Sequence, residues 1–130
     1  FSLPMIQILA GFTAVAGHMW SVFSGFRGGK GVLTALGMVI GLLPAAAAAC
    51  LVIWMIVFAL SRIVSLGSLV ASLALPLVVA LQKYGFHVQI PNGLFMFSII
   101  ICLLIWVAHH GNIRRLLAGT ENRFGRAKGA

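Results

Sequence analysis

The stretch GHMWSVFSGFRGGKGVLT, residues 17–34, decides how the chain is interpreted, because it is a polar segment with long apolar sequence on both sides. Residues 25–31 contain four glycines together with Arg27 and Lys30. Glycine-rich backbone can turn several N–H groups toward one point, and two nearby cations help such a loop to enclose an anion such as phosphate. At the edge of an apolar segment, this pattern indicates a protein that handles a phosphorylated substrate at a membrane surface.

The composition of the chain is that of an integral membrane protein. Of its 130 residues, 62% are hydrophobic and only 8% are charged, whereas soluble domains have roughly 25% charged residues. The net charge of +8 comes from nine Lys and Arg residues against one acid, Glu121. These cations flank apolar segments instead of lining a polar face, so we expect no nucleic-acid partner.

Five apolar segments predict an all-α, polytopic membrane bundle of about five short spans. Each segment is shorter than the roughly 20 residues that a full span usually needs. No linker composition separates them, so residues 1–130 are interpreted as a single transmembrane domain. The segments run approximately over Ser2–Ala16, Val32–Leu43, Ala45–Leu60, Leu66–Leu81 and Gly93–Val107.

Pro44 separates the second and third segments. Proline donates no backbone hydrogen bond and disfavours helix at Leu43, so Val32–Leu60 is either one kinked helix or two short ones. Two helices place eight of the nine Lys and Arg residues on one side of the membrane, whereas one helix divides them six against three. Because cytoplasmic loops carry an excess of Lys and Arg, we expect two helices with a break at Pro44.

The two-helix arrangement brings three polar segments to the same side of the membrane. They are residues 17–31, the string SRIVSLGS over residues 61–68, and the string HHGNIRRLLAGTENRFG over residues 109–125. Cations, hydroxyls, amides and glycine N–H groups are what a phosphate requires. Each good hydrogen bond to a charged oxygen contributes about 1.5–3 kcal/mol.

Several other kinds of site are disfavoured by the sequence. The glycine loop is not an ATP-binding P-loop, because Gly31 follows Lys30 where Ser or Thr is required. The chain has no aspartate and therefore no Ser-His-Asp triad, and its four histidines lack metal-ligand spacing, so we expect no metal or cofactor. Cys50 and Cys102 lie in apolar segments and are expected to be buried. The chemistry must then rely on an activated substrate and positioned positive charge.

Three strings, in order, resemble the bacterial acyl-phosphate:glycerol-3-phosphate acyltransferase family. They are GHMWSVFSGFRGGKGVLT, SRIVSLGS and H-x-x-N-I-x-R-L-x-x-G-T-E-N-x-x-G, and together they extend over almost the whole chain. Departures from the family pattern are Trp20-Ser21 in place of Phe-Pro and Arg27 in place of a common Lys. The resemblance implies seven membrane helices, of which this sequence holds the later five, so that an N-terminal portion with a further motif is missing.

The resemblance also implies roles for the glycine loop. The N–H groups of Gly28, Gly29 and Gly31, with Arg27 and Lys30, are expected to bind the phosphate of glycerol 3-phosphate at the start of the following helix. The alternative is a flexible turn whose cations anchor the chain at the interface.

Further site residues follow from the second and third motifs. His109 and Asn112 match the family's H-x-x-N pair, so they are expected to be catalytic: His109 would orient or deprotonate the glycerol hydroxyl and Asn112 would position an anion. Glu121 is expected to bind nearby arginines and hold the C-terminal segment; the alternative is that it acts as a base. Ser65 and Ser68 either cap the fourth helix or donate to the acyl phosphate. His18, in the first motif, either caps its helix or belongs to the site.

The function implied by the resemblance is transfer of a fatty acyl group from acyl phosphate to the 1-position of glycerol 3-phosphate, which forms lysophosphatidate for phospholipid synthesis. The expected location is the bacterial inner membrane, with the motif loops cytoplasmic and membrane lipid in contact with the spans. An alternative hypothesis is a transporter or channel subunit for a phosphorylated solute, which would need polar groups at mid-membrane depth. The apolar segments offer few of these: Gln7, Thr13, Ser72 and Ser98.

Overall fold

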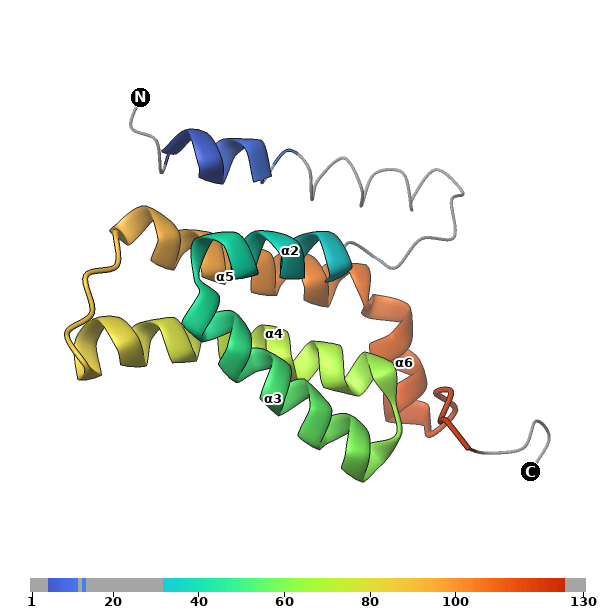
Figure 1. Ribbon diagram of the computed structural model, residues 1–130. Coiled ribbons are helices and arrows are strands. Elements are labelled where there is room, and N and C mark those ends of the chain that lie inside the picture. The colour runs from blue at the N-terminus through green and yellow to red at the C-terminus, as the bar shows by residue number, and fades with distance from the viewer. Residues whose placement is uncertain (1–4, 12, 14–31, 126–130) are drawn as a thin grey trace.

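Helices make up the regular secondary structure in the part of the chain that this computed structural model describes, residues 5–11, 13 and 32–125 (Figure 1). The predicted all-α class is confirmed. Residues 5–11 are helical, and a π-helical turn, η1 (Leu81–Gly85), continues α4. The remaining helices are α2 (Val32–Leu42), α3 (Pro44–Ser61), α4 (Val64–Ala80), α5 (Asn92–Ala108) and α6 (His110–Ala118).

The break at Pro44 is confirmed, and it separates two helices. Leu43 has φ −138° and ψ 65°, outside the helical region, and Pro44 is the first residue of α3. Proline suits this position because the first N–H of a helix has no partner inside the helix. The chain reverses its direction here, and α2 packs beside α3 (Figure 1). The single kinked helix is therefore excluded.

Two helical stretches are long and apolar enough to cross a membrane. They are Pro44–Ser61 and Val64–Gly85, with mean hydropathies of 2.2 and 2.3. α5 and α6, which meet at 61°, make a third if they are counted as one broken span. Within residues 5–11, 13 and 32–125, two or three stretches are therefore long enough to cross a membrane by length alone. The expected segments were shorter than a full span, and α2, with 11 residues, is one of them.

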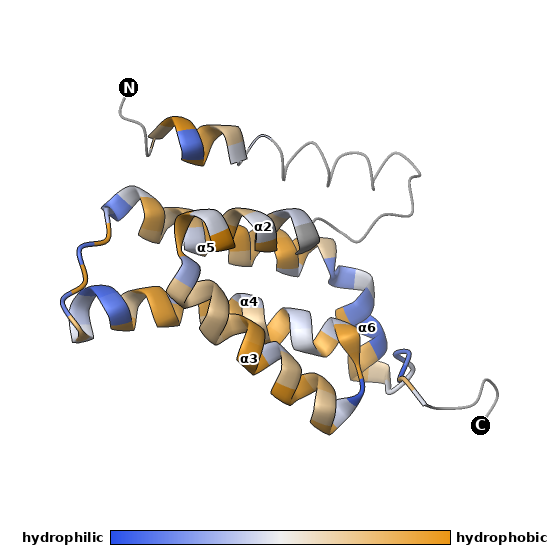
Figure 2. Cartoon of the chain, viewed as in Figure 1, coloured by the Kyte–Doolittle hydropathy of each residue, from blue (hydrophilic) through white to orange (hydrophobic). Residues whose placement is uncertain are grey.

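One expectation about the connections is wrong in detail. The third polar segment was expected to be a loop, but its residues 110–118 form α6, whose polar colouring sets it apart from the apolar α3, α4 and α5 in Figure 2. At the other end of the bundle, η1 carries α4 on to Gly85. Pro76 lies inside α4, as a membrane helix tolerates.

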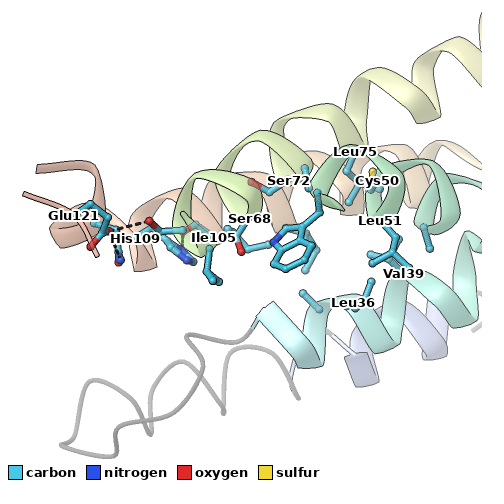
Figure 3. Close-up of a pocket in the computed structure, with 18 of the residues that line it drawn as sticks. Leu36, Val39, Cys50, Leu51, Ser68, Ser72, Leu75, Ile105, His109 and Glu121 are labelled. Atoms are coloured by element: carbon cyan, nitrogen blue, oxygen red, sulfur yellow. Dashed lines mark hydrogen bonds between the residues drawn. The ribbon is translucent and has the colours of Figure 1, made fainter. Parts of the chain in front are cut away.

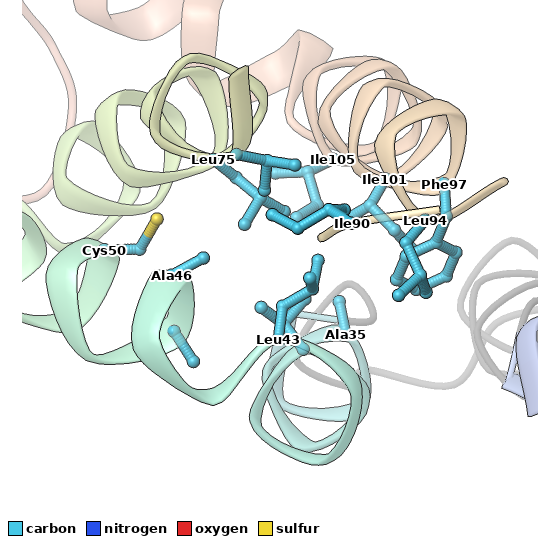
Figure 4. Packing of buried hydrophobic residues seen from close by; sticks show 13 residues of the cluster. Ala35, Leu43, Ala46, Cys50, Leu75, Ile90, Leu94, Phe97, Ile101 and Ile105 are labelled. Atoms are coloured by element: carbon cyan, nitrogen blue, oxygen red, sulfur yellow. The ribbon is translucent and has the colours of Figure 1, made fainter. Parts of the chain in front are cut away.

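The helices α2, α3, α4 and α5 pack around an apolar core (Figure 4). α4 lies between α3 and α5, and α2 contacts α3 and α5. Phe97, Ile101 and Val79 are among the largest fully buried side chains. The cluster comprises Ala35, Val39, Leu43, Ala46, Ala47, Cys50, Leu75, Val79, Ile90, Leu94, Phe97, Ile101 and Ile105.

The opposite end of the bundle gathers the polar segments. The α3–α4 connection, α6 and the C-terminal residues lie together there, and α2 begins at that end (Figure 1). Arg62, α6 and Arg123 bring cations to it, whereas Lys83 lies beyond the other end of α4 and donates to the Ile90 carbonyl. The described Lys and Arg residues thus divide between the two ends of the bundle as expected, with Lys83 at the end opposite the others.

An aromatic row fastens α3 to α4 at the polar end. A Cβ added at Gly67 of α4 would lie 2.9 Å from Cδ1 and Nε1 of Trp54, so the indole ring packs directly on the glycine backbone. Trp54 stacks on Phe58 with the ring centroids 5.2 Å apart, and Phe58 meets Phe124 edge-on at 5.6 Å. The row therefore extends from α4 to the C-terminal segment.

We predict that Gly67→Ala destabilises the protein by about 1–3 kcal/mol, because the new methyl group forces the rigid indole of Trp54 away from α4. Thermal unfolding in detergent micelles, followed by circular dichroism, measures the change. Gly37→Ala in α2 is the matched control: nothing lies within 4 Å of its added Cβ, so we expect no loss of stability. Equal midpoints for Gly67→Ala and the parent would contradict the packing argument.

Candidate functional site

A cavity of about 770 Å³ runs from the polar end of the bundle into its apolar interior (Figure 3). Glu121 and His109 lie at one end of it, and Leu75 and Cys50 lie toward the other. Its size is within the roughly 300–1,000 Å³ of ordinary small-molecule sites. Its described lining comprises Ala35, Leu36, Val39, Ala47, Cys50, Leu51, Trp54, Val64, Ser65, Ser68, Ala71, Ser72, Leu75, Ile101, Ile105, His109, Asn112, Arg115, Glu121, Asn122 and Phe124.

The carboxylate of Glu121 is the centre of the polar end. Its Oε2 accepts hydrogen bonds from Ser65 Oγ at 2.8 Å and from Asn112 Nδ2 at 2.7 Å. Its Oε1 accepts from Arg115 Nε at 3.0 Å and from the Asn122 backbone N–H at 3.1 Å. The side chain is only 4% exposed. One carboxylate thus joins α4, α6 and the C-terminal segment.

The backbone at the end of α6 places Glu121 in this position. Gly119 has φ +73°, a left-handed conformation that costs glycine little. The N–H of Thr120 donates to Arg115 O at 2.8 Å and that of Gly119 to Leu116 O at 3.2 Å, which is the Schellman arrangement. The chain therefore turns back along α6 and returns Glu121 toward Asn112.

A second backbone contact fixes the far end of this segment. Arg62, which ends α3, also adopts a left-handed conformation with φ 60°. Its carbonyl accepts a hydrogen bond from the N–H of Phe124 at 2.8 Å. The segment of residues 119–125 is thereby held at both ends, against α6 and against the α3–α4 connection.

The environment of Glu121 favours its ionised form. Burial by itself would raise the pKa of this carboxyl group, but the hydrogen bonds from Arg115, Asn112, Ser65 and the Asn122 N–H outweigh it and lower the pKa from 4.5 to about 2. A carboxylate that stays ionised at neutral pH and is occupied by four donors is suited to holding other groups in place. It is poorly suited to abstracting a proton.

His109 lies at the bend between α5 and α6 and is 5% exposed. Its Nδ1 lies 2.8 Å from the carbonyl oxygen of Ile105. Because a carbonyl only accepts, Nδ1 carries the hydrogen, and in the neutral ring Nε2 is then the basic nitrogen. The bend and this hydrogen bond therefore orient the ring and fix which nitrogen carries the hydrogen.

The structure brings all five of the described candidate residues to one cavity. His109, Asn112 and Glu121 line it together with Ser65 and Ser68. Neither serine caps α4: the helix begins at Val64 after Ile63, and no side-chain cap is formed. That interpretation is wrong, because the helix starts one residue before Ser65 and turns its hydroxyl toward Glu121.

The other candidates lie outside the described residues. These are His18 and the glycine-loop residues Arg27, Gly28, Gly29, Lys30 and Gly31. What the structure does describe is the helix after the loop: α2 begins at the end of the bundle where α6 and Glu121 lie (Figures 1 and 3).

Sequence analysis missed the residues that form the apolar part of the cavity. Trp54, Ala47 and Ala71 line it, yet in the sequence they are ordinary members of apolar helices. No local signal distinguishes them, because their role depends on which helix faces which. Arg115 was only one of several cations near Glu121, and its spacing of six residues across a glycine turn was the available clue.

Metal-ligating side chains do not cluster in the described part of the chain: it contains no group of three His, Cys, Asp or Glu residues able to hold a metal ion. Cys50 and Cys102 are both free and buried, as the sequence predicted.

Known proteins share this arrangement of motifs. Residues 1–119 match the family model described as glycerol-3-phosphate acyltransferase. The chain belongs to this family. Among its curated relatives, the glycerol-3-phosphate acyltransferase of Chlorobium phaeobacteroides is 41% identical over 93% of this chain and 60% of the relative. That of Salinibacter ruber is 44% identical over 92% of this chain and 52% of the relative.

Solved structures of the family have the same fold. Crystal structures of PlsY, an integral membrane glycerol 3-phosphate acyltransferase, match with a TM-score of 0.79 at 40% identity over 91% of this chain. One is its glycerol 3-phosphate form and the other its lysophosphatidic acid form. The chain spans about 56% of the length of the first. This member of the glycerol-3-phosphate acyltransferase family therefore spans little more than half of the relatives it matches.

Ionisation of Glu121 should make the protein sensitive to acid. Because the pKa of Glu121 is lowered in the folded state, its contribution is complete above about pH 4.5 and is lost as the pH falls toward 2. The shift corresponds to about 3 kcal/mol, so the parent should lose roughly that much stability over this interval more than Glu121→Gln does.

Thermal unfolding of both proteins between pH 5 and pH 2 measures this difference. Arg114→Gln is the control, because it removes an exposed neighbouring cation and leaves the four partners of Glu121 in place. Parallel pH profiles for the parent and Glu121→Gln would show that the buried carboxylate does not support the fold.

Proposed function

We propose that this chain forms the catalytic domain of an acyltransferase that moves a fatty acyl group from acyl phosphate to the 1-hydroxyl of glycerol 3-phosphate. The observation that carries the proposal is the polarity of the cavity: one end gathers charged and hydrogen-bonding groups, and the other is apolar. A molecule with an anionic head and a hydrocarbon tail matches both ends. The family and the bound forms of PlsY support the same conclusion.

The proposed reaction needs no covalent enzyme intermediate, because acyl phosphate is already activated. The hydroxyl oxygen of glycerol 3-phosphate attacks the acyl carbonyl carbon and forms the ester bond. The bond from that carbon to the anhydride oxygen breaks, and phosphate leaves with the electron pair. The hydroxyl proton passes to His109 Nε2 or to the leaving phosphate. The products are lysophosphatidate and inorganic phosphate.

In this mechanism the polar end of the cavity positions both substrates. His109 orients the hydroxyl, and Asn112 holds an anionic oxygen while Glu121 fixes its amide through the 2.7 Å hydrogen bond. Ser68 lines the cavity on the next turn of α4 from Ser65 and is placed to donate to the acyl phosphate. The residues that stabilise charge are thus separate from His109, which orients the attacking hydroxyl.

The glycine loop is proposed to bind the phosphate of glycerol 3-phosphate. Arg27, Lys30 and the N–H groups of Gly28, Gly29 and Gly31 directly precede α2. A helix N-terminus favours an anion through its unpaired N–H groups and its dipole. We also propose that the loop and α6 face the cytoplasm of a bacterial inner membrane, and that residues 1–130 act as one domain.

The decisive experiment incubates the intact protein, purified and reconstituted, with palmitoyl phosphate and labelled glycerol 3-phosphate. We expect labelled lysophosphatidate, with release of one phosphate for each product formed. The alternative hypothesis of a transporter predicts instead that label crosses the membrane of sealed vesicles unchanged. Flux without product would overturn the proposal.

Removal of either member of the His109–Asn112 pair should impair the chemical step. We predict that His109→Ala and Asn112→Ala lower kcat by about 10²–10⁴ and change KM much less, because both act on the reacting groups. Steady-state kinetics measures the change, and His110→Ala is the neighbouring control, since His110 is exposed. Full activity in both variants would exclude the assigned roles.

Lys30 should act mainly in binding. We predict that Lys30→Ala raises KM for glycerol 3-phosphate by about 10-fold to 100-fold, as expected for loss of one charged hydrogen bond of 1.5–3 kcal/mol. Titration of glycerol 3-phosphate at saturating acyl phosphate tests this. Lys83→Ala, at the opposite end of the bundle, should leave KM unchanged. An unchanged KM in Lys30→Ala would remove the phosphate-loop assignment.

A further inference from the structure

The apolar end of the cavity is bounded by residues of four different helices. From the polar end inward, its last lining residues are Val39 on α2, Ala47 on α3, Leu75 on α4 and Ile101 on α5. α2 and α4 enter the bundle from the polar end, whereas α3 and α5 run toward it (Figure 1). The four residues therefore mark the inner limit of the cavity on each helix.

Solid core begins one helical turn beyond this limit. Val79 follows Leu75 by four residues, Phe97 precedes Ile101 by four, and Leu43 lies four residues from both Val39 and Ala47. Val79 is 0% exposed, Phe97 1% and Leu43 6%, and all three belong to the packed core instead of the cavity lining. These three side chains form a floor, a name we use for Leu43, Val79 and Phe97.

The depth above the floor suits one acyl chain. Ser65 and Leu75 both line the cavity and are ten residues apart on α4, which corresponds to about 15 Å along a helix. Half of a hydrocarbon core about 30 Å thick, the depth reached by the chains of one leaflet, is also about 15 Å.

Small side chains keep this depth open. Ala47 and Cys50 of α3, with Ala71 of α4, line the cavity where larger residues would fill it (Figure 3). Ala47 is 3% exposed, and its N–H donates to the carbonyl of Leu43 of the floor, one turn away, at 2.9 Å. A larger residue at position 47 would therefore raise the bottom of the cavity.

We propose that the floor sets the longest acyl chain that the protein accepts, with Ala47 and Val79 as specificity-determining residues. The inference rests on the proposed acyl transfer, because the occupant of the cavity is the acyl tail of that reaction. A chain that reaches the floor fills the cavity, and each further methylene must displace packed core. The floor thus discriminates by length alone.

The test compares kcat/KM over a series of saturated acyl phosphates, from decanoyl to stearoyl, for the intact protein and three variants. Ala47→Leu should lower kcat/KM for the longest substrates by about tenfold or more and leave decanoyl phosphate unaffected. Val79→Ala should shift the optimum to longer chains, because it lowers the floor. Ala48→Leu is the matched control, since Ala48 is the exposed neighbour on α3 and should keep the parent profile.

The outcomes separate this inference from the proposed function. A parent that forms no lysophosphatidate from any acyl phosphate overturns both. An active parent whose length profile is the same in Ala47→Leu and Val79→Ala overturns the floor alone, and so does a loss in Ala47→Leu that is equal for every chain length. If Ala47→Leu fails to fold, Val79→Ala still tests the floor, because it should shift the preference toward longer acyl chains.

Discussion

The hydrogen bonds to the carboxylate of Glu121 are the constraint on which the polar half of the structure depends. Ser65 of α4, Asn112 and Arg115 of α6, and the backbone of Asn122 all donate to one side chain that is almost fully buried. Such a carboxylate is costly to bury unless every oxygen is paired, and here both oxygens are. These hydrogen bonds therefore hold α4, α6 and the C-terminal segment in a fixed arrangement around one side chain.

The cavity follows from this arrangement at one end and from side-chain size at the other. At the polar end, the bend at His109 turns α6 away from the direction of α5, and Asn112 and Glu121 line the cavity there. In the interior, Ser72 and Ser98 give their hydroxyl hydrogens to carbonyls of their own helices, so they add little polarity. The cavity therefore offers charged and hydrogen-bonding groups at one end and apolar side chains at the other.

Much of this could be predicted from the sequence because it depends on local chemistry. Pro44 disfavours helix at the residue before it, and Leu43 is indeed non-helical. The H-x-x-N spacing places His109 and Asn112 near each other in any helical turn. The cavity depth could not be predicted, since it depends on how α2, α3, α4 and α5 align. Ser65 shows the limit: its sequence position suits a helix cap, but the fold starts α4 one residue earlier and gives the hydroxyl to Glu121.

The pairing of Glu121 with Arg115 has a consequence for the ions around the protein. The sequence holds nine Lys and Arg residues and a single Asp or Glu, which is already engaged. Within residues 1–130, the other eight cations have no further acidic side chain to pair with. Lipid headgroups and dissolved anions can serve as their counterions, and this attraction weakens as added salt shortens the Debye length. The ionic strength of the medium therefore affects the electrostatics of the folded protein as well as those of the membrane around it.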